Sequence, residues 1–455
     1  MSDPDVVVIP TPGLGNSTYL VAVDGRAAAI DVPRDAWRIH DVAEQRGWRI
    51  THVLETHVHN DYLSGALELA ASDEATIVAP AEGGYDFGGQ PAREGFELDL
   101  GGAGLVARAT PGHTPEHLSW ELQDSRGRPT TLFSGGSLLI GGVGRTDLLG
   151  LARLDEMTAA QYRTMRRLEE LPDDVIVRPT HGAGSFCVAG DVDITGDATI
   201  GALRRWNPAF AAPDLAAFEG ELAAGRTLYP FYYRRMAPLN RRGPRLLGGP
   251  PTANAMTTQE FADARAAGAW VLDARDRWAF AELHLQGSWN IEAGDSFAAY
   301  AGWLLPYDAP LCLVVDSPEQ EVEVRDELSR IGYDHVLGHL AGGLDAWLAV
   351  GGETSSYETA SWEALRTADP RQILDVRQPY EWREGAIPGS RRVFVADLPG
   401  AVDDLADGSS YLVACRTGVR AAIAASILDA AGIAVRPVVD GGVPALPANE
   451  LEPAG

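Results

Sequence analysis

The chain has 455 residues, which is enough for two to four domains at about 100–200 residues each. Its formal net charge is −27, and all 37 basic residues are arginine. Such an acidic chain lacks the basic face that nucleic-acid phosphates or an anionic membrane surface need, so we expect neither as a partner.

Apolar residues make up 45% of the chain, enough to bury hydrophobic cores, but no run reaches the roughly 18 apolar residues of a membrane span. The N-terminus, Met1 to Asp5, is acidic and has no signal-peptide character. The three cysteines, Cys187, Cys312 and Cys415, are too few for a disulfide framework. We therefore expect a cytoplasmic protein with free thiols.

Short β-like runs between Gly, Pro and Asp turns fill the N-terminal part of the chain. These runs are Val6–Ile9, Thr18–Val23, Ala27–Ile30, Ile50–Leu54 and Leu105–Thr110. A helical stretch from Asp155 to Glu170 follows, with Asp155 as its expected N-cap, and then a strand, Val175–Arg178. The mixture predicts packed sheets with covering helices.

Four histidines follow strand-like runs. His57 and His59 come just after Ile50–Leu54, and alternation places both imidazoles on the same side, within reach of one metal ion. His113 stands in a Thr-Pro-Gly-His turn, and His181 follows another strand. One such histidine is usually a hydrogen-bonded loop residue, but four in similar places indicate a metal site.

Two Gly-rich breaks, Gly243–Pro251 and Gly351–Ser356, look like linkers. The segments that follow them repeat each other at similar spacing, which indicates a duplicated α/β unit of about 100 residues. The matched blocks are Val271–Arg275 with Ile373–Arg377, Gly287-Ser288 with Gly389-Ser390, Leu313–Asp316 with Leu412–Cys415, and Gly342-Gly343 with Gly441-Gly442.

Cys415 begins a six-residue loop, Cys415–Arg420, that leads directly into the helical run Ala421–Leu428. A loop of this kind points backbone N–H groups at the sulfur, and the helix dipole with Arg416 and Arg420 favours the thiolate. A lone cysteine is usually structural, but this spacing indicates a nucleophile.

The histidine motifs resemble those of the metallo-β-lactamase superfamily, specifically its persulfide dioxygenase branch. The superfamily pattern His-x-His-x-Asp-His and the later histidines are met by His57, His59, Asp61, His113 and His181. Gly144–Asp147 and His181–Cys187 are also similar to that branch. Two positions depart from the pattern: Tyr62 replaces the sixth-position histidine, and Gly136 replaces the bridging aspartate.

Both departures remove ligands from the second metal position, so the resemblance implies one metal, held by His57, His59 and His113. The iron ligands of the persulfide dioxygenase branch correspond to His59, His113 and the missing aspartate. A triad of two histidines and one carboxylate therefore requires that Asp61 or Asp147 bind the ion in place of the missing aspartate. The expected ion is Fe(II), with positions open for a sulfur ligand and O₂. The alternatives are Zn(II) with a bound hydroxide and a site without metal.

Asp61, Tyr62, Arg145, Asp147 and His181 are candidates for supporting the metal or contacting the substrate. Tyr62 either donates a hydrogen bond to a bound oxygen or fills the vacated ligand site. Arg145 either pairs with a substrate carboxylate or anchors its loop against Asp147.

Three further residues are expected to have no chemical role. His117 lies four residues after His113 and has no clear partner, so we expect it at the surface. Cys187 could face the metal site, but we expect a buried, inert thiol there, and the same for Cys312 inside its apolar run.

The segment 357–455 resembles a rhodanese (sulfurtransferase) domain, on the motifs Leu374–Arg377, Gly385–Gly389 and the Cys415 loop. The resemblance implies that Cys415 is the nucleophile that carries sulfane sulfur and that Arg416 and Arg420 cradle it.

The segment 252–350 resembles a second, degenerate rhodanese domain. Asp316 stands at the position of Cys415, and the loop Asp316–Gln320 contains no arginine. A carboxylate cannot accept sulfane sulfur as a thiolate does, so we expect this copy to be structural.

The expected fold class is α/β, with a metallo-β-lactamase αββα sandwich in residues 1–247 and two rhodanese-like α/β domains in 252–350 and 357–455. The expected function is sulfane-sulfur metabolism. The N-terminal site would use O₂ to release sulfite from a low-molecular-weight persulfide, and Cys415 would pass sulfur from thiosulfate or a persulfide to a thiol.

Two alternatives to this function remain at this point. The N-terminal domain could be a zinc-dependent thioester hydrolase of the glyoxalase-II type, or a metal-free scaffold beside an active Cys415. The expected partners are small molecules, namely a persulfide, thiosulfate and thiols, and the formation of a homo-oligomer is left open.

Overall fold

The computed structural model describes residues 3–187 and 198–452. The contacts between residues divide the chain into two compact units, 1–250 with 329–332 and 251–328 with 333–455. The three predicted domains are a finer division than this one, and their boundaries stay predictions.

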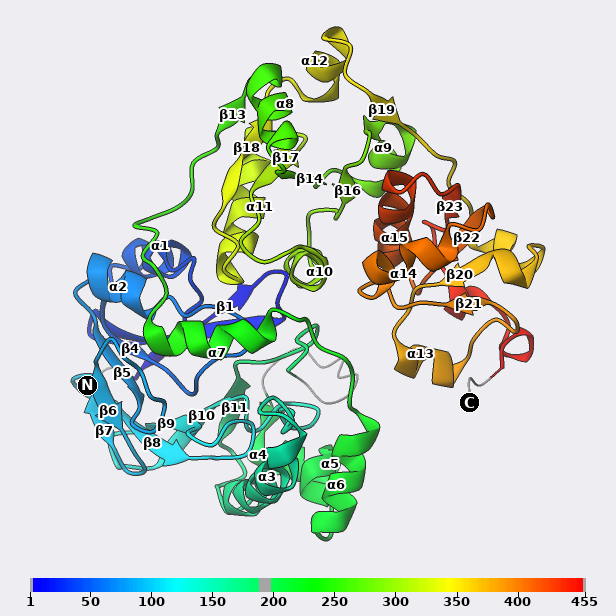
Figure 1. The fold of residues 1–455 in the computed structure, drawn as a ribbon. Helices are drawn as coiled ribbons and strands as arrows, with labels where there is room; N and C mark the ends of the chain where they lie inside the picture. The colour runs from blue at the N-terminus through cyan, green and yellow to red at the C-terminus, as the bar shows by residue number, and fades with distance from the viewer. Residues whose placement is uncertain (1–2, 188–197, 453–455) are drawn as a thin grey trace. The chain divides into compact units, whose positions relative to one another are not determined.

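Two six-stranded sheets form the centre of the first unit, with the strand orders β1-β2-β3-β4-β5-β6 and β12-β11-β10-β9-β8-β7 (Figure 1). All five β-like runs expected in this part of the chain overlap strands. The strands are β1 (Asp5–Thr11), β2 (Asn16–Val23), β3 (Arg26–Ile30), β4 (Arg49–Leu54), β5 (Thr76–Pro80), β6 (Gln90–Ala92), β7 (Glu97–Asp99), β8 (Gly104–Ala109), β9 (Leu118–Gln123), β10 (Pro129–Gly135), β11 (Ile176–Pro179) and β12 (Ala198–Thr199).

Helices cover the outer faces of both sheets. The helices of this unit are α1 (Trp37–Gln45), α2 (Ala66–Ser72), α3 (Leu154–Leu168), α4 (Ile200–Trp206), α5 (Pro208–Ala211), α6 (Leu215–Ala224) and α7 (Tyr233–Arg242), with a short 3₁₀ turn, η1 (Leu151–Arg153), before α3. The prediction of Asp155 as the N-cap is wrong. The turn η1 leads directly into α3, so the N-cap is Arg153 and the helix begins at Leu154. Asp155 lies in the first turn of the helix, where its negative charge suits the helix dipole.

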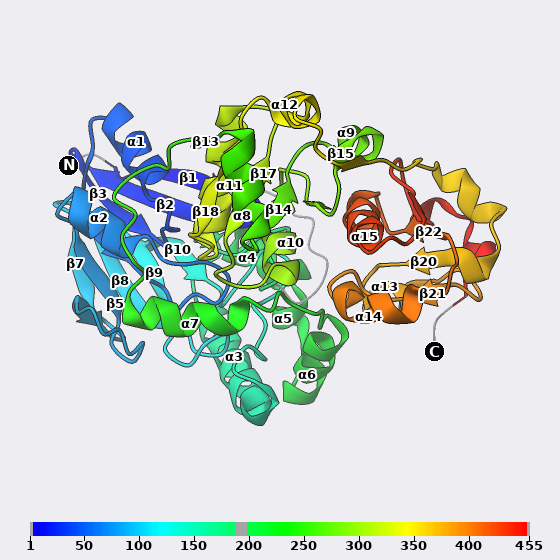
Figure 2. The same cartoon turned by 45° about the horizontal axis from the view of Figure 1, so that its top comes forward.

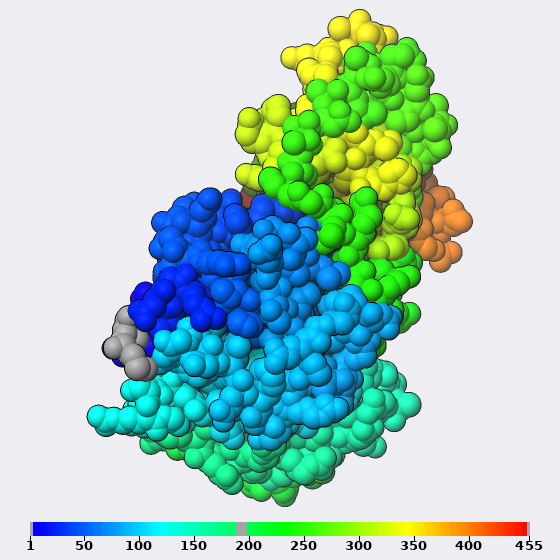
Figure 3. Space-filling model, turned by 90° about the vertical axis from the view of Figure 1, so that its left-hand side faces the viewer, coloured from blue at the N-terminus to red at the C-terminus, as the bar shows by residue number. Residues whose placement is uncertain are grey.

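Three apolar layers hold this unit together. Trp120 and Phe133 lie in the core between the two sheets, Ile39 of α1 packs on the outer face of the first sheet, and Met165 and Phe218 pack on the second. The order helix, sheet, sheet, helix is the predicted αββα sandwich, and the fold class is confirmed. The space-filling view shows the blue and cyan N-terminal segments as a continuous surface (Figure 3).

The second unit contains the two repeats, each built on a mainly parallel sheet. The sheet orders are β13-β18-β17-β14-β16 and β21-β20-β22-β23, with a two-stranded pair β15-β19. The strands are β13 (Ala255–Met256), β14 (Trp270–Asp273), β15 (His284–Leu285), β16 (Trp289–Asn290), β17 (Leu311–Val314), β18 (Val336–Leu340), β19 (Thr354–Ser355), β20 (Ile373–Asp375), β21 (Arg391–Arg392), β22 (Tyr411–Ala414) and β23 (Val435–Pro437).

The helices of the second unit alternate with these strands, as the duplicated α/β pattern predicts. Helix α15 packs beside β22 and β23 (Figure 1), and Figure 2 shows α15 next to β22 from another side. They are α8 (Thr258–Ala266), α9 (Arg277–Glu282), α10 (Phe297–Leu304), α11 (Pro318–Arg330), α12 (Gly343–Ala349), α13 (Pro379–Glu384), α14 (Leu398–Leu405) and α15 (Val419–Ala430), with 3₁₀ turns η2 (Trp362–Arg366), η3 (Pro370–Gln372), η4 (Val443–Ala445) and η5 (Ala448–Glu450).

The repeated Leu-Asp-x-Arg block has the same structural role in both repeats. Asp273 ends β14 and accepts hydrogen bonds from Arg275 Nε and Nη2 at 3.0 and 2.7 Å. Asp375 ends β20 and accepts the equivalent bonds from Arg377 at 2.9 and 2.6 Å. Each arginine also donates to a backbone carbonyl further along the chain, so the pair fixes the turn after the strand.

Of the two predicted linkers, Gly243–Pro251 carries no helix or strand. The second is partly regular, because Thr354–Ser355 forms β19 and pairs antiparallel with β15. Within residues 3–187 and 198–452, we find no helix that is both long enough and apolar enough to span a bilayer.

Candidate metal centre and sulfur-transfer site

The histidine cluster lies at the carboxyl ends of three strands, β4, β8 and β11. His57 and His59 follow β4, which pairs in parallel with β3, and His181 follows β11, which pairs in parallel with β10. His113 lies in the turn between β8 and β9. The four predicted histidines are at most 1% exposed. The ring centroids of His59, His113 and His181 lie 4.3, 5.0 and 5.3 Å from that of His57, so the four rings form one cluster.

Three overlapping buried groups in this cluster have donor atoms within 4.8 Å of one another, the distance range of ligands around one ion. The groups are His57 with His113 and His181, Asp31 with His57 and His59, and His59 with Asp61 and His181. Within the described residues, the predicted set of His57, His59 and His113 is not one of these groups.

In the three-histidine group, each Nδ1 has a hydrogen-bond partner outside the group. These contacts join His57 to Thr56 Oγ1 (2.7 Å), His113 to the Arg145 carbonyl oxygen (2.9 Å) and His181 to Asn16 Oδ1 (3.1 Å). The Nε2 atoms of His57 and His181 lie 3.4 Å apart, and His113 Nε2 is buried without a hydrogen-bond partner. Metal-binding histidines are usually fixed through their second nitrogen in this way.

Burial and the neighbouring imidazoles hold the pKa of His57 well below its usual value and lower the pKa of His113 to about 3. Both rings are therefore neutral at physiological pH, the form that binds metal. The three imidazoles of this group have ring nitrogens close enough to hold one divalent ion, and they suit Fe(II) and Zn(II) alike.

His59 has a different environment. Its Nε2 lies 3.0 Å from Glu55 Oε2, 3.3 Å from Asp31 Oδ1 and 3.0 Å from the Tyr62 hydroxyl. Burial alone would lower the pKa of His59, but the two carboxylates outweigh it and raise the pKa to about 10. Its Nδ1 is buried without a partner. In this structure His59 therefore contacts the two acids through Nε2, and its Nδ1 is the ring nitrogen without a partner.

Tyr62 fills the position where the sixth-position histidine is missing. Its side chain is 1% exposed and its ring stacks on His59, with the centroids 4.3 Å apart. Of the two roles considered for Tyr62, the structure supports the packed tyrosine. Asp61 lies beside His181, 3.3 Å from its Nδ1, and accepts a hydrogen bond from Asn16 Nδ2 at 2.7 Å.

Gly136, the position without the bridging aspartate, lies against His113. A Cβ built on Gly136 would be 2.3 Å from His113 Cδ2 and 2.7 Å from His113 Nε2. The His113 ring therefore occupies space that any side chain at position 136 would need. No aspartate fits there with His113 in this position.

Helix α7 fixes the turn that carries His59 and Tyr62. Asn240 Nδ2 donates to the carbonyl oxygens of both residues at 2.8 Å, and its Oδ1 accepts from the Ser64 backbone N–H at 2.8 Å. Asn240 was not foreseen from the sequence, because it is 178 residues from Tyr62 and stands in no recognisable motif.

The sequence also did not reveal the two acidic residues that contact His59, Asp31 and Glu55. Asp31 and Glu55 directly follow β3 and β4, and Asp31 has a positive φ of 55°. Asp31 accepts hydrogen bonds from the backbone N–H and hydroxyl of Thr56, both at 2.8 Å. The available signal was a polar residue at the carboxyl end of each buried strand, the same signal that identified the histidines.

Arg145 and Asp147 form an ion pair, with distances of 2.6 and 2.8 Å, and Arg145 also donates to the Phe186 and Thr227 carbonyls. The structure thus supports the loop-anchoring role of Arg145. Its own carbonyl holds His113. Cys187 is buried as expected, and burial raises the pKa of its thiol well above the usual value.

The expectation that His117 lies at the surface is wrong. The side chain is 1% exposed, its Nδ1 contacts Thr110 Oγ1 at 2.8 Å and its Nε2 accepts the Gly136 backbone N–H at 3.0 Å. Both ring nitrogens are occupied, so His117 supports the turn behind His113.

Cys415 directly follows β22, and its side chain is fully buried. The Gly418 backbone N–H donates to its sulfur at 3.1 Å. Gly418 has a φ of 99°, and a Cβ there would lie 2.4 Å from the Val439 carbonyl oxygen, so only glycine fits this turn. The loop leads into α15 as the sequence predicts.

The two arginines of this loop differ. Arg416 is exposed, whereas Arg420 forms a two-pronged ion pair with Glu381, with Nη2 at 2.8 Å from Oε1. Although burial opposes it, Arg420 holds the pKa of Glu381 below its usual value. Burial raises the pKa of Tyr300 to about 12, with Arg420 opposing and Cys415 contributing. The ion pair shows how Arg420 is held, and the predicted roles of both arginines stay predictions.

The degenerate repeat retains a hollow at the equivalent position. A cavity of about 470 Å³ is lined by Asp316, Ser317, His339 and Gly342, among others. Asp316 itself is exposed, and its backbone N–H donates to Gln320 Oε1 at 2.7 Å. Cys312 is buried inside β17, as expected.

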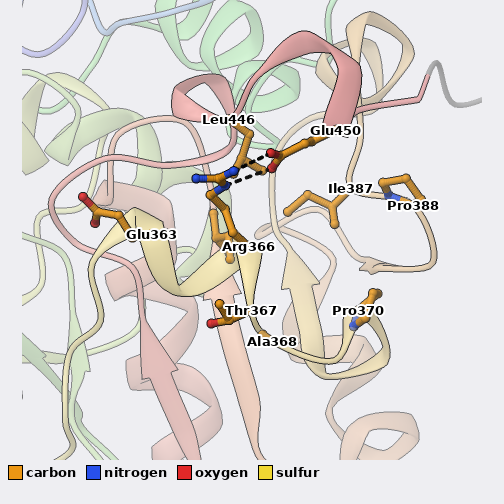
Figure 4. Close-up of a pocket in the computed structure, with 10 residues that line it drawn as sticks. Glu363, Arg366, Thr367, Ala368, Pro370, Ile387, Pro388, Leu446 and Glu450 are labelled. Atoms are coloured by element: carbon orange, nitrogen blue, oxygen red, sulfur yellow. Dashed lines mark hydrogen bonds and ion pairs between the residues drawn. The ribbon is translucent and has the colours of Figure 1, made fainter.

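A larger cavity of about 660 Å³ lies in the second repeat, between η2, η5 and the turn at Ile387 and Pro388 (Figure 4). Its charged groups Arg366 and Glu450 pair with each other at 2.9 Å. None of the predicted site residues lines it, so it plays no part in the chemistry considered below.

Comparison with known families agrees with this architecture. Residues 11–181 match the metallo-beta-lactamase superfamily, and residues 257–350 and 359–447 each match the rhodanese-like domain. The chain thus combines an N-terminal metallo-β-lactamase fold with two rhodanese-like domains.

Among individual proteins, the chain is 34% identical to the hydroxyacylglutathione hydrolase of Methylococcus capsulatus over 160 residues, which cover 34% of this chain and 57% of that protein. It is 30% identical to the same enzyme of Rhodopseudomonas palustris over 174 residues, 37% of this chain and 63% of that one. The match spans less than two thirds of either relative.

A solved structure, a metallo-β-lactamase from Staphylococcus aureus, is also similar to this protein. It has a TM-score of 0.67 and 27% sequence identity, and the match covers 74% of this chain and 99% of that one. These comparisons support a hydrolase-type metal fold joined to sulfurtransferase-type domains.

Proposed function

We propose that the protein is a two-site enzyme of sulfane-sulfur metabolism. The observation that carries this proposal is that one chain contains two buried sites. Cys415, in a rhodanese-like domain, has the Gly418 N–H 3.1 Å from its sulfur, and the N-terminal domain contains a buried histidine cluster. Joining two sites that use one intermediate raises its effective concentration at the second site.

At Cys415 the proposed reaction is transfer of sulfane sulfur. The thiolate attacks the outer sulfur of thiosulfate, the S–S bond breaks, and sulfite leaves with the bonding electron pair. A thiol acceptor in its thiolate form then attacks the Cys415 persulfide, takes the outer sulfur and regenerates the Cys415 thiolate. The Gly418 N–H, 3.1 Å from the Cys415 sulfur, would stabilise negative charge on this atom when it is a thiolate.

At the histidine cluster the proposed reaction converts a thiol persulfide, O₂ and water into the thiol, sulfite and two protons. An Fe(II) ion held by three imidazoles would supply open positions for the persulfide sulfur and for O₂. The chain's own contribution is to exclude water and fix the rings, since Thr56, Arg145 and Asn16 each hold one Nδ1.

The test of this half is persulfide-dependent O₂ uptake with sulfite formation by protein loaded with Fe(II) under anaerobic conditions. A low-molecular-weight thiol persulfide should support uptake, and His113→Ala should abolish it while leaving thiosulfate sulfurtransfer intact. Iron-loaded protein that consumes no O₂ with any thiol persulfide would rule out the dioxygenase half.

A zinc-dependent thioester hydrolase is the second candidate for the N-terminal site. It is favoured by the similarity to hydroxyacylglutathione hydrolases at 30–34% identity. Against it, Tyr62 and Gly136 remove two ligands of the second metal position that a two-metal clamp would use. Turnover of an S-acyl thioester by zinc-loaded protein, without O₂ uptake by the iron form, would favour this candidate over the dioxygenase.

The third alternative, a scaffold without metal, makes a different prediction. Under it, His113→Ala changes no activity of the protein, and Cys415→Ser removes the only one. Measuring O₂ uptake, thioester hydrolysis and sulfurtransfer with both variants separates all three alternatives.

A further inference from the structure

We propose that the first rhodanese-like repeat, which has no cysteine in the loop after β17, binds a small organic cation in the cavity at that loop. The expected ligand is an amine that also carries a hydrogen-bond donor, such as a hydroxyl group, at some distance from its ammonium group. This binding is independent of the chemistry proposed for Cys415 and for the histidine cluster.

The loop after β17 is shorter than the loop after β22. Helix α11 begins at Pro318, two positions after Asp316, whereas α15 begins at Val419, four positions after Cys415. The two residues that are absent from the first repeat leave space at the carboxyl end of its sheet.

The matched glycine pairs after β18 and β23 show where this space lies. In the second repeat, a Cβ on Gly442 would lie 2.0 Å from the Cys415 carbonyl oxygen, so the longer loop packs directly against this glycine. In the first repeat, a Cβ on the matching Gly343 would meet no atom of the described residues within 4 Å. The cavity of the first repeat therefore occupies the place that the Cys415 loop fills in the second.

A buried histidine lines this cavity. His339 is 8% exposed, and its Nδ1 donates to Glu321, whose carboxylate is fully buried and also accepts from Arg325 Nε at 2.6 Å. Among the residues that the structure describes, His339 Nε2 has no hydrogen-bond partner. With its proton on Nδ1, the ring presents Nε2 as a hydrogen-bond acceptor.

The second repeat has no such histidine. Counted back from the matched glycine pairs, the residue at the position of His339 is Val438, which is fully buried in an apolar cluster. Replacing a buried valine by a histidine paired with a buried glutamate costs free energy unless the polar atoms are satisfied. Since Glu321 satisfies only Nδ1, the remaining ring nitrogen is available to a molecule in the cavity.

The charges around the cavity favour a cation. Asp316 and Asp345 line it and are exposed, and in the described part of the chain neither carboxylate has a hydrogen-bond or ion-pair partner. Arg275 also lines the cavity, but Asp273 neutralises its guanidinium group through a contact of 2.7 Å. Two unpaired carboxylates attract an ammonium group and repel an anion.

The start of α11 offers no anion site, because its first N–H groups are occupied. The Gln320 N–H donates to Ser317 Oγ and the Glu321 N–H to the Ser317 carbonyl oxygen, both at 3.2 Å. The Asp316 N–H donates to Gln320 Oε1 at 2.7 Å. The helix start therefore binds its own side chains and backbone.

The three acceptors are too far apart for one metal ion. Within the residues described, Asp316, Asp345 and His339 do not form a group with ligand atoms all within 4.8 Å of one another. A molecule that reaches them needs an ammonium group at one end and a second donor at the other. Val314 and Leu340 also line the cavity and would contact its apolar middle, and the volume of about 470 Å³ lies within the roughly 300–1,000 Å³ of small-molecule sites.

The experiment measures the binding of tyramine to the full-length protein by isothermal titration calorimetry at about 0.15 M ionic strength. Tyramine has an ammonium group on one side of an aromatic ring and a phenol hydroxyl on the other. Three analogues each change one end. Tyrosol replaces the ammonium group by a neutral hydroxyl, hydroxyphenylacetate carries a carboxylate at that end, and phenethylamine lacks the phenol hydroxyl.

We expect saturable binding of tyramine, with tyrosol and hydroxyphenylacetate weaker by at least about 10-fold and phenethylamine weaker by about 5-fold, the loss of one hydrogen bond. The double variant Asp316→Asn, Asp345→Asn should weaken tyramine binding by about 10-fold, since each exposed charge contributes modestly.

His339→Phe, which keeps a ring but removes the acceptor, should weaken tyramine binding by about 5-fold and leave phenethylamine binding unchanged. The matched control Asp403→Asn, Asp404→Asn removes two exposed carboxylates from α14 and should bind tyramine like the parent protein. Circular dichroism of each variant checks that it is folded. If His339→Phe does not fold, the analogues and the aspartate variants still decide the outcome.

Four results would overturn the inference. The first is the absence of tyramine binding, and the second is equal binding of tyramine and hydroxyphenylacetate. The third is an equal loss of affinity in the α14 control, which would show a general attraction of cations to an acidic surface. The fourth is loss of binding in Cys415→Ser, which would place the ligand in the other repeat.

Discussion

The two rhodanese-like repeats keep the same framework and differ at one loop. In both, an aspartate at the end of the first core strand pairs with an arginine two residues later, at 2.7 Å in one repeat and 2.6 Å in the other. In the second repeat the loop after β22 carries Cys415, buried under a glycine N–H. In the first, the loop after β17 carries an exposed Asp316 whose own N–H is bound by Gln320.

The difference teaches that the framework and the reactive loop vary independently. The Asp–Arg pair stabilises the turn after the strand wherever the fold is kept. The loop after β22 has in addition a left-handed glycine, Gly418, and an arginine, Arg420, held by Glu381. The two repeats therefore share the framework and differ in the loop where a nucleophile is proposed.

The largest expected effect comes from removing the proposed nucleophile, Cys415. Cys415→Ser should reduce transfer of sulfur from thiosulfate to a thiol below detection, because a hydroxyl does not form a persulfide. Cys312→Ala in the other repeat is the matched control and should keep near-parental activity. If Cys415→Ser retained transfer and Cys312→Ala lost it, the assignment of the active repeat would be wrong.

Breaking the ion pair behind the loop should have the next largest effect. Arg420 and Glu381 are 11% and 3% exposed, so Glu381→Gln should cost about 2–3 kcal/mol of unfolding free energy, somewhat less than a fully buried pair. The measurement is chemical denaturation. Glu450→Gln, which breaks the exposed pair with Arg366 in Figure 4, should leave stability unchanged.

The same pair gives a pH dependence. Arg420 keeps the pKa of Glu381 below its usual 4.5 in the folded protein, against the effect of burial. A lowered carboxyl pKa stabilises the fold above the unfolded value and is lost as pH falls through the folded one. The stability difference between the parent and Glu381→Gln should therefore be constant from pH 7 to about 5.5 and shrink below pH 4.5. A difference that grows on acidification would contradict the assignment.

The smallest expected effect is the reverse substitution in the inactive repeat. Asp316→Cys in a Cys415→Ser background should restore no sulfurtransfer, because the loop has no arginine and its first N–H is engaged by Gln320. Recovery of more than a trace of activity would show that the thiol alone is sufficient, and that the loop around Cys415 is not required.

The fold was accessible from sequence because its signals are local. Alternating apolar runs such as Thr18–Val23 marked strands, and the repeat from Val271 to Arg275 and from Ile373 to Arg377 marked the duplication. The errors were at element ends. The start of α3 depends on a preceding 3₁₀ turn, and the second linker contains a strand because β15 pairs with it.

The candidate site could be predicted from the sequence only in part, because its hydrogen bonds join residues that are far apart in the chain. The spacing brought His57, His113 and His181 into one cluster but could not show which nitrogen faces which neighbour. The position of His59 is set by Glu55 and by Asn240, which is 181 residues away. His117 appeared partnerless because its partners are backbone and hydroxyl groups, and such groups leave no mark in a sequence motif.

The close approach of Gly136 to His113 has a consequence for substitutions at position 136. A Gly136→Asp substitution would place a Cβ 2.3 Å from the Cδ2 atom of His113, so it would displace this ring. The His113 ring would have to move before a carboxylate could fit at position 136.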